Sequence, residues 1–370
     1  MTNLVPRWVA PNLLTLVGLI HAVAAYVLLL VHSPGLDGAA PPWVYVACAA
    51  CLFVYQTMDG MDGKQARRTN SGSPLGEVID HGADAIAACV YGVFICDAFG
   101  VGWDRGFSGA GRWPAVALIA YSRCAFLLDS VTATYTGRLP VSRLDAQELQ
   151  IVTQLVLLWN ASGGAAVWRY PLDLSAVLFS GDGGGGSGAS SGGVPLGLAL
   201  VGFCAGGGAF ARFKSTSDAL RGPPSPHLPA YAERGPAIIY LRVLSFELVL
   251  TAAVACCGNF PLCHAVTTVA FGETMVRLMH LRVSDPNFNP LSSIYLSAYV
   301  AGATLVPAAA GGELGWSERG LAAAGTSLVL GALWEYASTF TSLASQITGC
   351  LGLPSNPFVL PTKGGKKRAE

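Results

Sequence analysis

The sequence predicts an all-α, polytopic integral membrane protein with about ten transmembrane helices. Hydrophobic side chains make up 52% of the 370 residues and charged ones only 12%, whereas about 25% of the residues of a typical soluble domain are charged. The mean hydropathy is positive. Ten separated apolar stretches account for this excess of hydrophobic residues, and each is expected to be long enough to cross a bilayer, at about 20 residues per helix.

Glycine, proline and polar residues divide the apolar stretches into predicted spans. These are residues 12–31, 42–58, 82–99, 113–128, 149–168, 194–211, 236–257, 263–281, 291–309 and 321–347. The first is predicted to be a membrane helix rather than a cleaved signal peptide, because it is long and further spans follow at once. The whole chain, 1–370, is therefore expected to form one membrane domain, with a flexible Gly/Ser loop at 181–193 and a basic C-terminal tail at 354–370.

The distribution of basic residues predicts the orientation of the spans. With the N-terminus in the cytosol and ten alternating spans, 18 of the 22 Lys and Arg residues fall on the cytosolic side. Such a skew follows the positive-inside rule, so both termini are predicted to be cytosolic. The 22 basic residues are balanced by 22 acidic ones, so the net charge gives no indication of a nucleic-acid partner. The ten cysteines lie in or beside apolar segments and are expected to be small buried hydrophobes.

Four aspartates stand out at the end of the second span and the start of the third. Asp59 and Asp62 are three residues apart, and Asp80 and Asp84 are four apart. On helices, each pair lies on a single face. The stretch between them, Thr69–Leu75, reads as a turn in which Ser73 is the N-cap and Pro74 the first helical residue. Residues 42–99 are thus predicted to form a catalytic hairpin whose four carboxylates face one another.

Unpaired carboxylates so close together would repel one another, and divalent cations resolve that repulsion. A ligand set of oxygen atoms without thiols suits Mg²⁺ or Mn²⁺. Two such ions are suited to clamp a diphosphate. Small residues on the same surface (Gly60, Gly63, Ala66 and Gly76) would let a nucleotide approach the backbone closely. The alternative is a solvated loop in which the acids pair with Lys64, Arg67 and Arg68, but charge pairing does not require the ordered spacing of small and acidic residues.

These residues resemble the signature of the CDP-alcohol phosphotransferases, D-x2-D-G-x2-A-R-x8-G-x3-D-x3-D, and every fixed position is present. The resemblance is closest to the eukaryotic choline/ethanolamine phosphotransferases. It extends to the opening of the first span, residues 10–16 (APNLLTL), to Tyr55-Gln56 and to Asp80-His81-Gly82. A weaker likeness continues at residues 135–139, at Glu148 and at residues 279–280 and 346–349.

The resemblance implies a ten-helix fold with a cytosol-facing catalytic cavity. The implied activity is transfer of phosphocholine and/or phosphoethanolamine from the CDP-alcohol to diacylglycerol, which releases CMP and makes phosphatidylcholine or phosphatidylethanolamine. The expected location is the endoplasmic reticulum, with the Golgi as the alternative, and a homodimer is compatible with it. Relatives carry a longer N-terminal segment with an interfacial amphipathic helix, whereas this sequence begins about a dozen residues before its first predicted span, as a truncated or a minimal form would.

The resemblance also assigns residues. The positions that match the metal ligands, for two Mg²⁺ or Mn²⁺ ions, are Asp59, Asp62, Asp80 and Asp84. The positions that match the lining of the CDP site are Asn12, Gly63, Ala66, Arg67 and Glu77.

Two further residues are candidates for catalysis. His81 lies among the acids, and a histidine near neutrality suits the role of general base; the alternative is a partner that holds Asp80 or Asp84 in place. Glu148 starts the fifth span, where it would orient His81 or, alternatively, cap the helix. An ammonium head group would be held by an acid or by an aromatic face such as Tyr55 or Tyr135. The sequence does not fix which of these holds it, so it does not distinguish choline from ethanolamine as the head group.

Two rival functions fit parts of the pattern. A CDP-diacylglycerol-dependent phosphatidyltransferase with an inositol or glycerol phosphate acceptor shares the signature, but His81 beside Asp80 and the ten predicted spans favour the aminoalcohol branch. A ten-span secondary transporter would show inverted repeats with paired broken helices, and the sequence has no such symmetry.

Overall fold

The computed structural model is a bundle of helices. It describes residues 5–103, 112–136, 146–172, 194–221, 260–283, 318–353 and 356–358, together with 247, 251 and 254. Within these residues the elements are α1 (Pro11–His32), α2 (Pro42–Thr69), α3 (Pro74–Ala98), α4 (Trp113–Thr136), α5 (Ala146–Ala161), the 3-10 helix η3 (Gly164–Arg169), β1 (Pro171–Leu172), β2 (Val194–Pro195), α7 (Leu196–Leu220), α9 (Phe260–Val283) and α11 (Glu318–Leu351).

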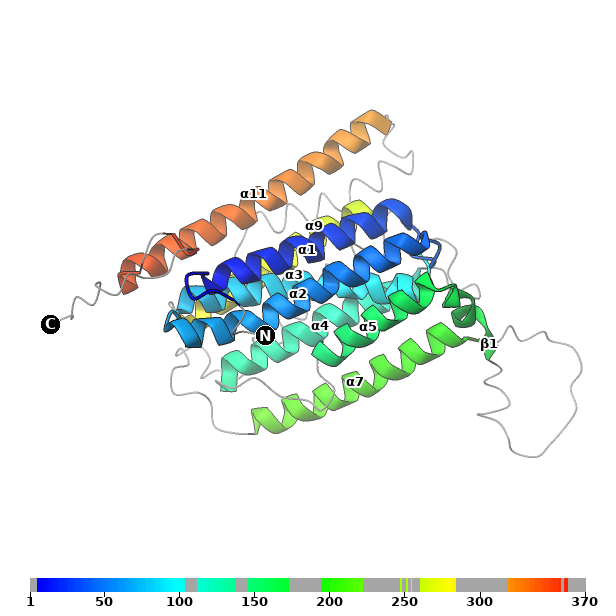
Figure 1. Cartoon of the computed structure of the whole chain (residues 1–370), viewed down its shortest axis with the longest axis horizontal. Helices are drawn as coiled ribbons and strands as arrows, with labels where there is room; N and C mark the ends of the chain where they lie inside the picture. The colour runs from blue at the N-terminus through cyan, green and yellow to red at the C-terminus, as the bar shows by residue number, and fades with distance from the viewer. Residues whose placement is uncertain are drawn as a thin grey trace, which may run out of the picture.

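The helices run side by side along the longest axis of the molecule (Figure 1). Helix α7 packs against α4 on one flank, and α11 packs against α9 on the other. The two short strands pair in antiparallel fashion, with Pro171 opposite Pro195 and Leu172 opposite Val194. They join η3 to α7 at one end of the bundle.

Five of the described helices are long and apolar enough to cross a membrane. They are Pro11–His32, Pro42–Thr69, Pro74–Ala98, Trp113–Ala133 and Leu196–Asp218. The chain is therefore a largely helical membrane protein, whereas the predicted total of ten spans is not confirmed. The predicted spans at 236–257 and 291–309 lie outside the described residues, apart from Glu247, Thr251 and Val254, and so do the loop at 181–193 and most of the tail at 354–370.

One predicted span is wrong in its extent. Residues 149–168 are not one helix, because α5 ends at Ala161. Gly163 follows with a φ of +93°, a left-handed conformation that favours glycine and breaks the helix, and the chain then continues as η3.

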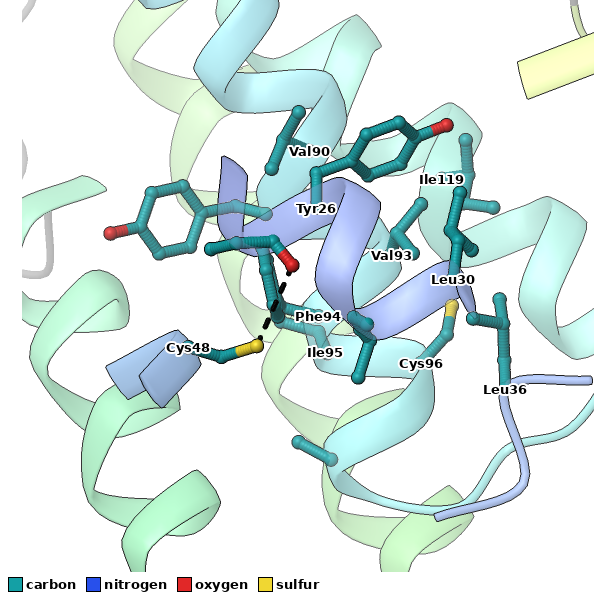
Figure 2. Close-up of a cluster of buried hydrophobic side chains, with 14 of the residues drawn as sticks. Tyr26, Leu30, Leu36, Cys48, Val90, Val93, Phe94, Ile95, Cys96 and Ile119 are labelled. Atoms are coloured by element: carbon teal, nitrogen blue, oxygen red, sulfur yellow. Dashed lines mark hydrogen bonds between the residues drawn. The ribbon is translucent and has the colours of Figure 1, made fainter. Parts of the chain in front are cut away.

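The central core joins α1 to α4. Figure 2 shows Tyr26 and Leu30 of α1 packed with Phe94 of α3 and Ile119 of α4, and these side chains are all at most 8% exposed. Cys48 of α2 is fully buried and donates a hydrogen bond to the carbonyl oxygen of Ala25 at 3.5 Å. This apolar packing holds both α2 and α3 against α1.

Both hairpin helices extend beyond their predicted spans. Helix α2 continues from residue 58 to Thr69. Helix α3 begins at Pro74, the predicted first helical residue, ahead of the span predicted from residue 82. Between them, Asn70 closes α2 in the left-handed region at φ +53°, a conformation that asparagine tolerates better than most residues. The oxygen of Ser73 accepts a hydrogen bond from the backbone N–H of Gly76 at 3.1 Å, so the predicted N-cap is confirmed. All four aspartates therefore lie on helices.

Ion pairs tie further helices to the bundle. Arg123 of α4 is fully buried and donates to Glu247 at 2.7 Å and to Thr267 of α9 at 3.3 Å. Arg277 of α9 contacts Glu273 of its own helix at 2.6 Å and Glu335 of α11 at 3.5 Å. Arginine thus supplies the counter-charge for buried glutamates in this part of the molecule.

Candidate active site

The four aspartates of the hairpin gather where α2 and α3 face each other. One carboxylate oxygen from each of Asp59, Asp62 and Asp80 lies within 4.8 Å of the other two. Asp84 joins this group because its carboxyl is within hydrogen-bonding reach of that of Asp59. The carboxyls of Asp62 and Asp80 are also within hydrogen-bonding reach of each other. The structure therefore places the two helical pairs opposite each other, as their spacing predicts.

The donor set of this cluster fits a divalent cation. Its candidate ligands are carboxylate oxygens, the hard donors that Mg²⁺ prefers and that also suit Mn²⁺. A cation with oxygen ligands at about 2.1 Å holds neighbouring ligand atoms roughly 3 Å apart and opposite ones roughly 4 Å apart. The separations of up to 4.8 Å seen here would close to that range with small side-chain movements.

Two hydroxyl groups contact the cluster, and neither contact was predicted from the sequence. The Oγ1 atom of Thr15, on α1, donates to Asp62 Oδ2 at 2.6 Å. The hydroxyl of Tyr55, on α2, donates to Asp84 Oδ1 at 2.9 Å. The only sequence signals were a hydroxyl residue in the apolar first helix and a tyrosine one turn before Asp59.

The position of Tyr55 argues against the prediction that its ring holds the ammonium head group. Its side chain is 2% exposed, and its ring packs beside that of Tyr91 with 6.2 Å between the ring centres. A ring enclosed in this way does not present an open face to an ammonium group. The side chain of Tyr135, the other aromatic candidate, lies outside the described part of the structure.

The predicted nucleotide-binding positions lie at the exposed end of α2 and the start of α3. A side chain at Gly60 would meet no atom within 4 Å, and one at Gly63 would meet only Arg67 Nη1, at 3.8 Å. Gly63 and Arg67 are exposed, and Ala66 and Glu77 are half-buried. The backbone of this turn of α2 is thus open to close approach by a ligand.

Asn12 closes the other side of this region. Its Oδ1 atom faces Gly76, where an added Cβ would lie 3.3 Å away. Its Nδ2 atom donates to the carbonyl oxygen of Pro357 at 2.7 Å. A segment from beyond α11 therefore reaches the start of α1, next to the first turn of α3.

His81 is anchored on α3 through one of its ring nitrogens. Its Nδ1 atom lies 3.0 Å from the carbonyl oxygen of Glu77. A carbonyl oxygen only accepts, so Nδ1 carries the hydrogen, and in the neutral ring Nε2 is the basic nitrogen. His81 is half-buried and near enough to Asp59 for their charges to interact. Its role, as base or as support, stays a prediction.

Glu148 lies in the first turn of α5, with an exposed side chain. Helix α5 is fixed to α2 because Gln56 donates to the carbonyl oxygen of Gln147 at 3.0 Å and accepts from Gln154 at 3.0 Å. Helix α5 also packs against α3, which carries His81. The orienting role of Glu148 stays a prediction.

The first step of identification comes from the family model. Residues 8–178 match the model described as CDP-alcohol phosphatidyltransferase. This stretch runs from the residues before α1 to beyond η3 and includes the whole acidic hairpin. This part of the chain is therefore similar to that family.

The chain is also similar to individual proteins. Cholinephosphotransferase 1 of Homo sapiens is 37% identical over 177 residues, which cover 47% of this chain and 41% of the human protein. Cholinephosphotransferase 1 of Mus musculus is 36% identical over 183 residues, covering 47% and 42%. A protein of Dictyostelium discoideum named uncharacterized CDP-alcohol phosphatidyltransferase class-I family protein 2 is 34% identical over 171 residues, covering 45% and 39%. The chain spans about two fifths of the length of these relatives.

Proposed function

We propose that the protein transfers phosphocholine and/or phosphoethanolamine from the CDP-alcohol to diacylglycerol and releases CMP. The observation that carries this proposal is the convergence of Asp59, Asp62 and Asp80 to within 4.8 Å on a hairpin that bears the complete CDP-alcohol signature. The similarity to cholinephosphotransferases supports the choice of head group.

In the proposed reaction, the hydroxyl oxygen of diacylglycerol attacks the phosphorus that bears the head group. The bond from that phosphorus to the bridging oxygen breaks, and CMP leaves with the bonding electrons. Bound divalent cations supply charge neutralisation for the diphosphate and the leaving group. We assign their ligation to Asp59, Asp62, Asp80 and Asp84, with Mg²⁺ or Mn²⁺ as the two ions.

The other predicted residues either bind the CDP moiety or take part in proton transfer. The open backbone at Gly63 and the side chains of Asn12, Ala66, Arg67 and Glu77 line the CDP moiety. The Nε2 atom of His81 accepts the hydroxyl proton, since Nδ1 is held by the carbonyl of Glu77. Glu148 orients the histidine from α5.

The proposal extends to the cellular setting. We place the enzyme in the endoplasmic reticulum, with the Golgi as the alternative, as a ten-span protein with both termini and the catalytic cavity facing the cytosol. The skew of basic residues supports that orientation. A homodimer is compatible with this arrangement.

The decisive experiment is an assay of CMP release by the purified full chain. With CDP-choline or CDP-ethanolamine as donor and Mg²⁺ or Mn²⁺ present, CMP should appear only when diacylglycerol is added, together with the matching phospholipid. Asp80→Asn serves as the inactive control. Activity that instead requires CDP-diacylglycerol with inositol or glycerol phosphate would contradict the proposal and support the phosphatidyltransferase alternative.

A further inference from the structure

The carboxylate of Asp62 is held from two sides by donors on two different helices. Thr15 Oγ1 of α1 donates to Oδ2 at 2.6 Å, and the backbone N–H of Gly63 donates to Oδ1 at 2.5 Å. Each carboxylate oxygen has two lone pairs, so neither of these two bonds saturates the oxygen that accepts it. Asp62 is 6% exposed and Thr15 is 5% exposed, so the contact is shielded from water.

Close packing fixes α1 at the distance that this contact requires. Gly18 lies one turn beyond Thr15 and faces α2. A Cβ at Gly18 would come within 3.2 Å of Met58 Cβ and 3.3 Å of the carbonyl oxygen of Tyr55. The absence of a side chain at this position therefore lets α1 approach α2 closely enough for the Thr15 hydroxyl to reach Asp62.

The segment that leads into α1 is anchored to the same helix. Gln65 of α2 is fully buried, and its Nε2 atom donates to the carbonyl oxygens of Pro6 at 3.0 Å and Val9 at 2.9 Å. Thr15 thus lies between two fixed points, the Gln65 contacts before it and the Gly18 contact after it. The backbone at Thr15 is therefore positioned by contacts that do not involve Asp62.

The Thr15 hydroxyl has a second possible acceptor, a backbone carbonyl oxygen of its own helix. A threonine in a helix commonly bonds back to the carbonyl oxygen four residues earlier. In Thr15 that oxygen, on Pro11, is 3.5 Å away, whereas Asp62 Oδ2 is 2.6 Å away. The shorter bond therefore goes to the acid on the neighbouring helix.

From these contacts we propose that Thr15 is a positioning residue that orients Asp62 for divalent-cation binding, so that α1 contributes to the metal centre. The inference rests on the proposed function, in which Asp62 is a metal ligand. Outer residues that orient a ligand commonly change metal affinity by about 10–100-fold when they are replaced. Thr15→Val removes the hydroxyl and keeps the shape of the side chain.

The test is Mn²⁺ binding to the purified full chain in detergent, without CDP-alcohol, followed by the electron paramagnetic resonance signal of free Mn²⁺. Thr15→Val should weaken binding about 10–100-fold. Thr15→Ser keeps the hydroxyl and should bind like the wild type. Thr274→Val is the matched control, because Thr274 is a buried threonine on α9 whose hydroxyl donates to Ala270 of its own helix at 3.0 Å.

The outcomes separate this inference from the proposed function. If the wild type binds no Mn²⁺, the proposed metal centre is wrong whatever Thr15 does. If the wild type binds Mn²⁺ and Thr15→Val binds equally well, the role of Thr15 is overturned and the metal centre stands. An equal loss in folded Thr15→Ser would also overturn it, because the hydroxyl would then not be the cause. Thr15→Ala replaces Thr15→Val if the valine variant does not fold.

Discussion

Two acidic regions of this protein are organised in opposite ways. Glu247 has a positive partner inside the bundle, because Arg123 donates to it at 2.7 Å and both side chains are at most 2% exposed. The aspartates of the hairpin face one another instead, with Asp59, Asp62 and Asp80 within 4.8 Å. Their described hydrogen bonds come from the hydroxyls of Thr15 and Tyr55 and from a backbone N–H.

The difference indicates whether each region needs a bound cation to balance its charge. A buried carboxylate with an arginine beside it is electrically complete, and removing either partner leaves an uncompensated charge. Carboxylates that face one another repel, and a bound cation relieves that repulsion. The first arrangement therefore serves the fold, whereas the second is suited to hold a positive ligand.

The largest expected effect is at the hairpin. Asp80→Asn should abolish transfer, because loss of one ligand disrupts both cation binding and diphosphate alignment. A ligand at 100 times its dissociation constant stabilises a protein by about 2.7 kcal/mol, so the wild type should unfold at a higher temperature when Mn²⁺ is added, and the variant should not. Near wild-type turnover in well-expressed Asp80→Asn would contradict the metal centre.

His81 tests whether a base works inside the acidic region. His81→Ala should lower the rate constant about 10²–10⁴-fold while leaving Mn²⁺ and CDP-choline binding largely intact. The pH–rate profile should also lose its ascending limb, because a protonated imidazole cannot accept the hydroxyl proton. Turnover measured across a Mn²⁺ titration distinguishes the two roles. Recovery of the rate at saturating Mn²⁺ would show that His81 supports the ligands and is not the base.

The arginine-paired region should respond in stability rather than in metal binding. Arg123→Met should destabilise the protein by about 3–5 kcal/mol, because Glu247 is left buried without its partner. Replacing Glu247 with leucine in the same chain should recover much of that loss. The matched control is Arg221→Met, which removes an exposed pair with Asp218 at 3.7 Å and should cost about 0–1 kcal/mol. Thermal unfolding with and without Mn²⁺ measures all three, and a selective loss of Mn²⁺ binding in Arg123→Met would break the comparison.

The smallest expected effect is at Glu148, in the first turn of α5. Glu148→Gln should reduce turnover modestly and shift the midpoint of the pH–rate profile, because the carboxylate would no longer support the charged form of His81. An unchanged profile would leave Glu148 as a helix cap. Gln147→Ala next to it is a suitable control, because Gln56 contacts the backbone of Gln147 and not its side chain.

The sequence predicts the local features of the site well. The i,i+3 and i,i+4 spacings place each acid pair on one helix face, and Ser73 and Pro74 mark the start of α3. The predicted helix ends are less accurate, because hydropathy falls where the charged residues begin while the backbone hydrogen bonds of α2 continue to Thr69. The roles assigned to the site residues stay predictions.

The contacts between distant segments were not predictable in this way. The bonds from Thr15 to Asp62 and from Asn12 to Pro357 join residues 47 and 345 positions apart. They depend on how closely helices pack, which periodicity in a single sequence does not report. The close approach at Gly18 is recognisable only once Met58 and Tyr55 are known to lie opposite it.

The bond between Asn12 and Pro357 has a consequence for biosynthesis. The two residues are 345 positions apart, and chains are elongated at about 5–20 residues per second, so roughly 17–70 seconds separate their appearance at the ribosome. Throughout that interval the start of α1 lacks its C-terminal partner. The region around Asn12 therefore reaches its final form only when translation has passed residue 357, even though α1 is the first of the described helices to be made.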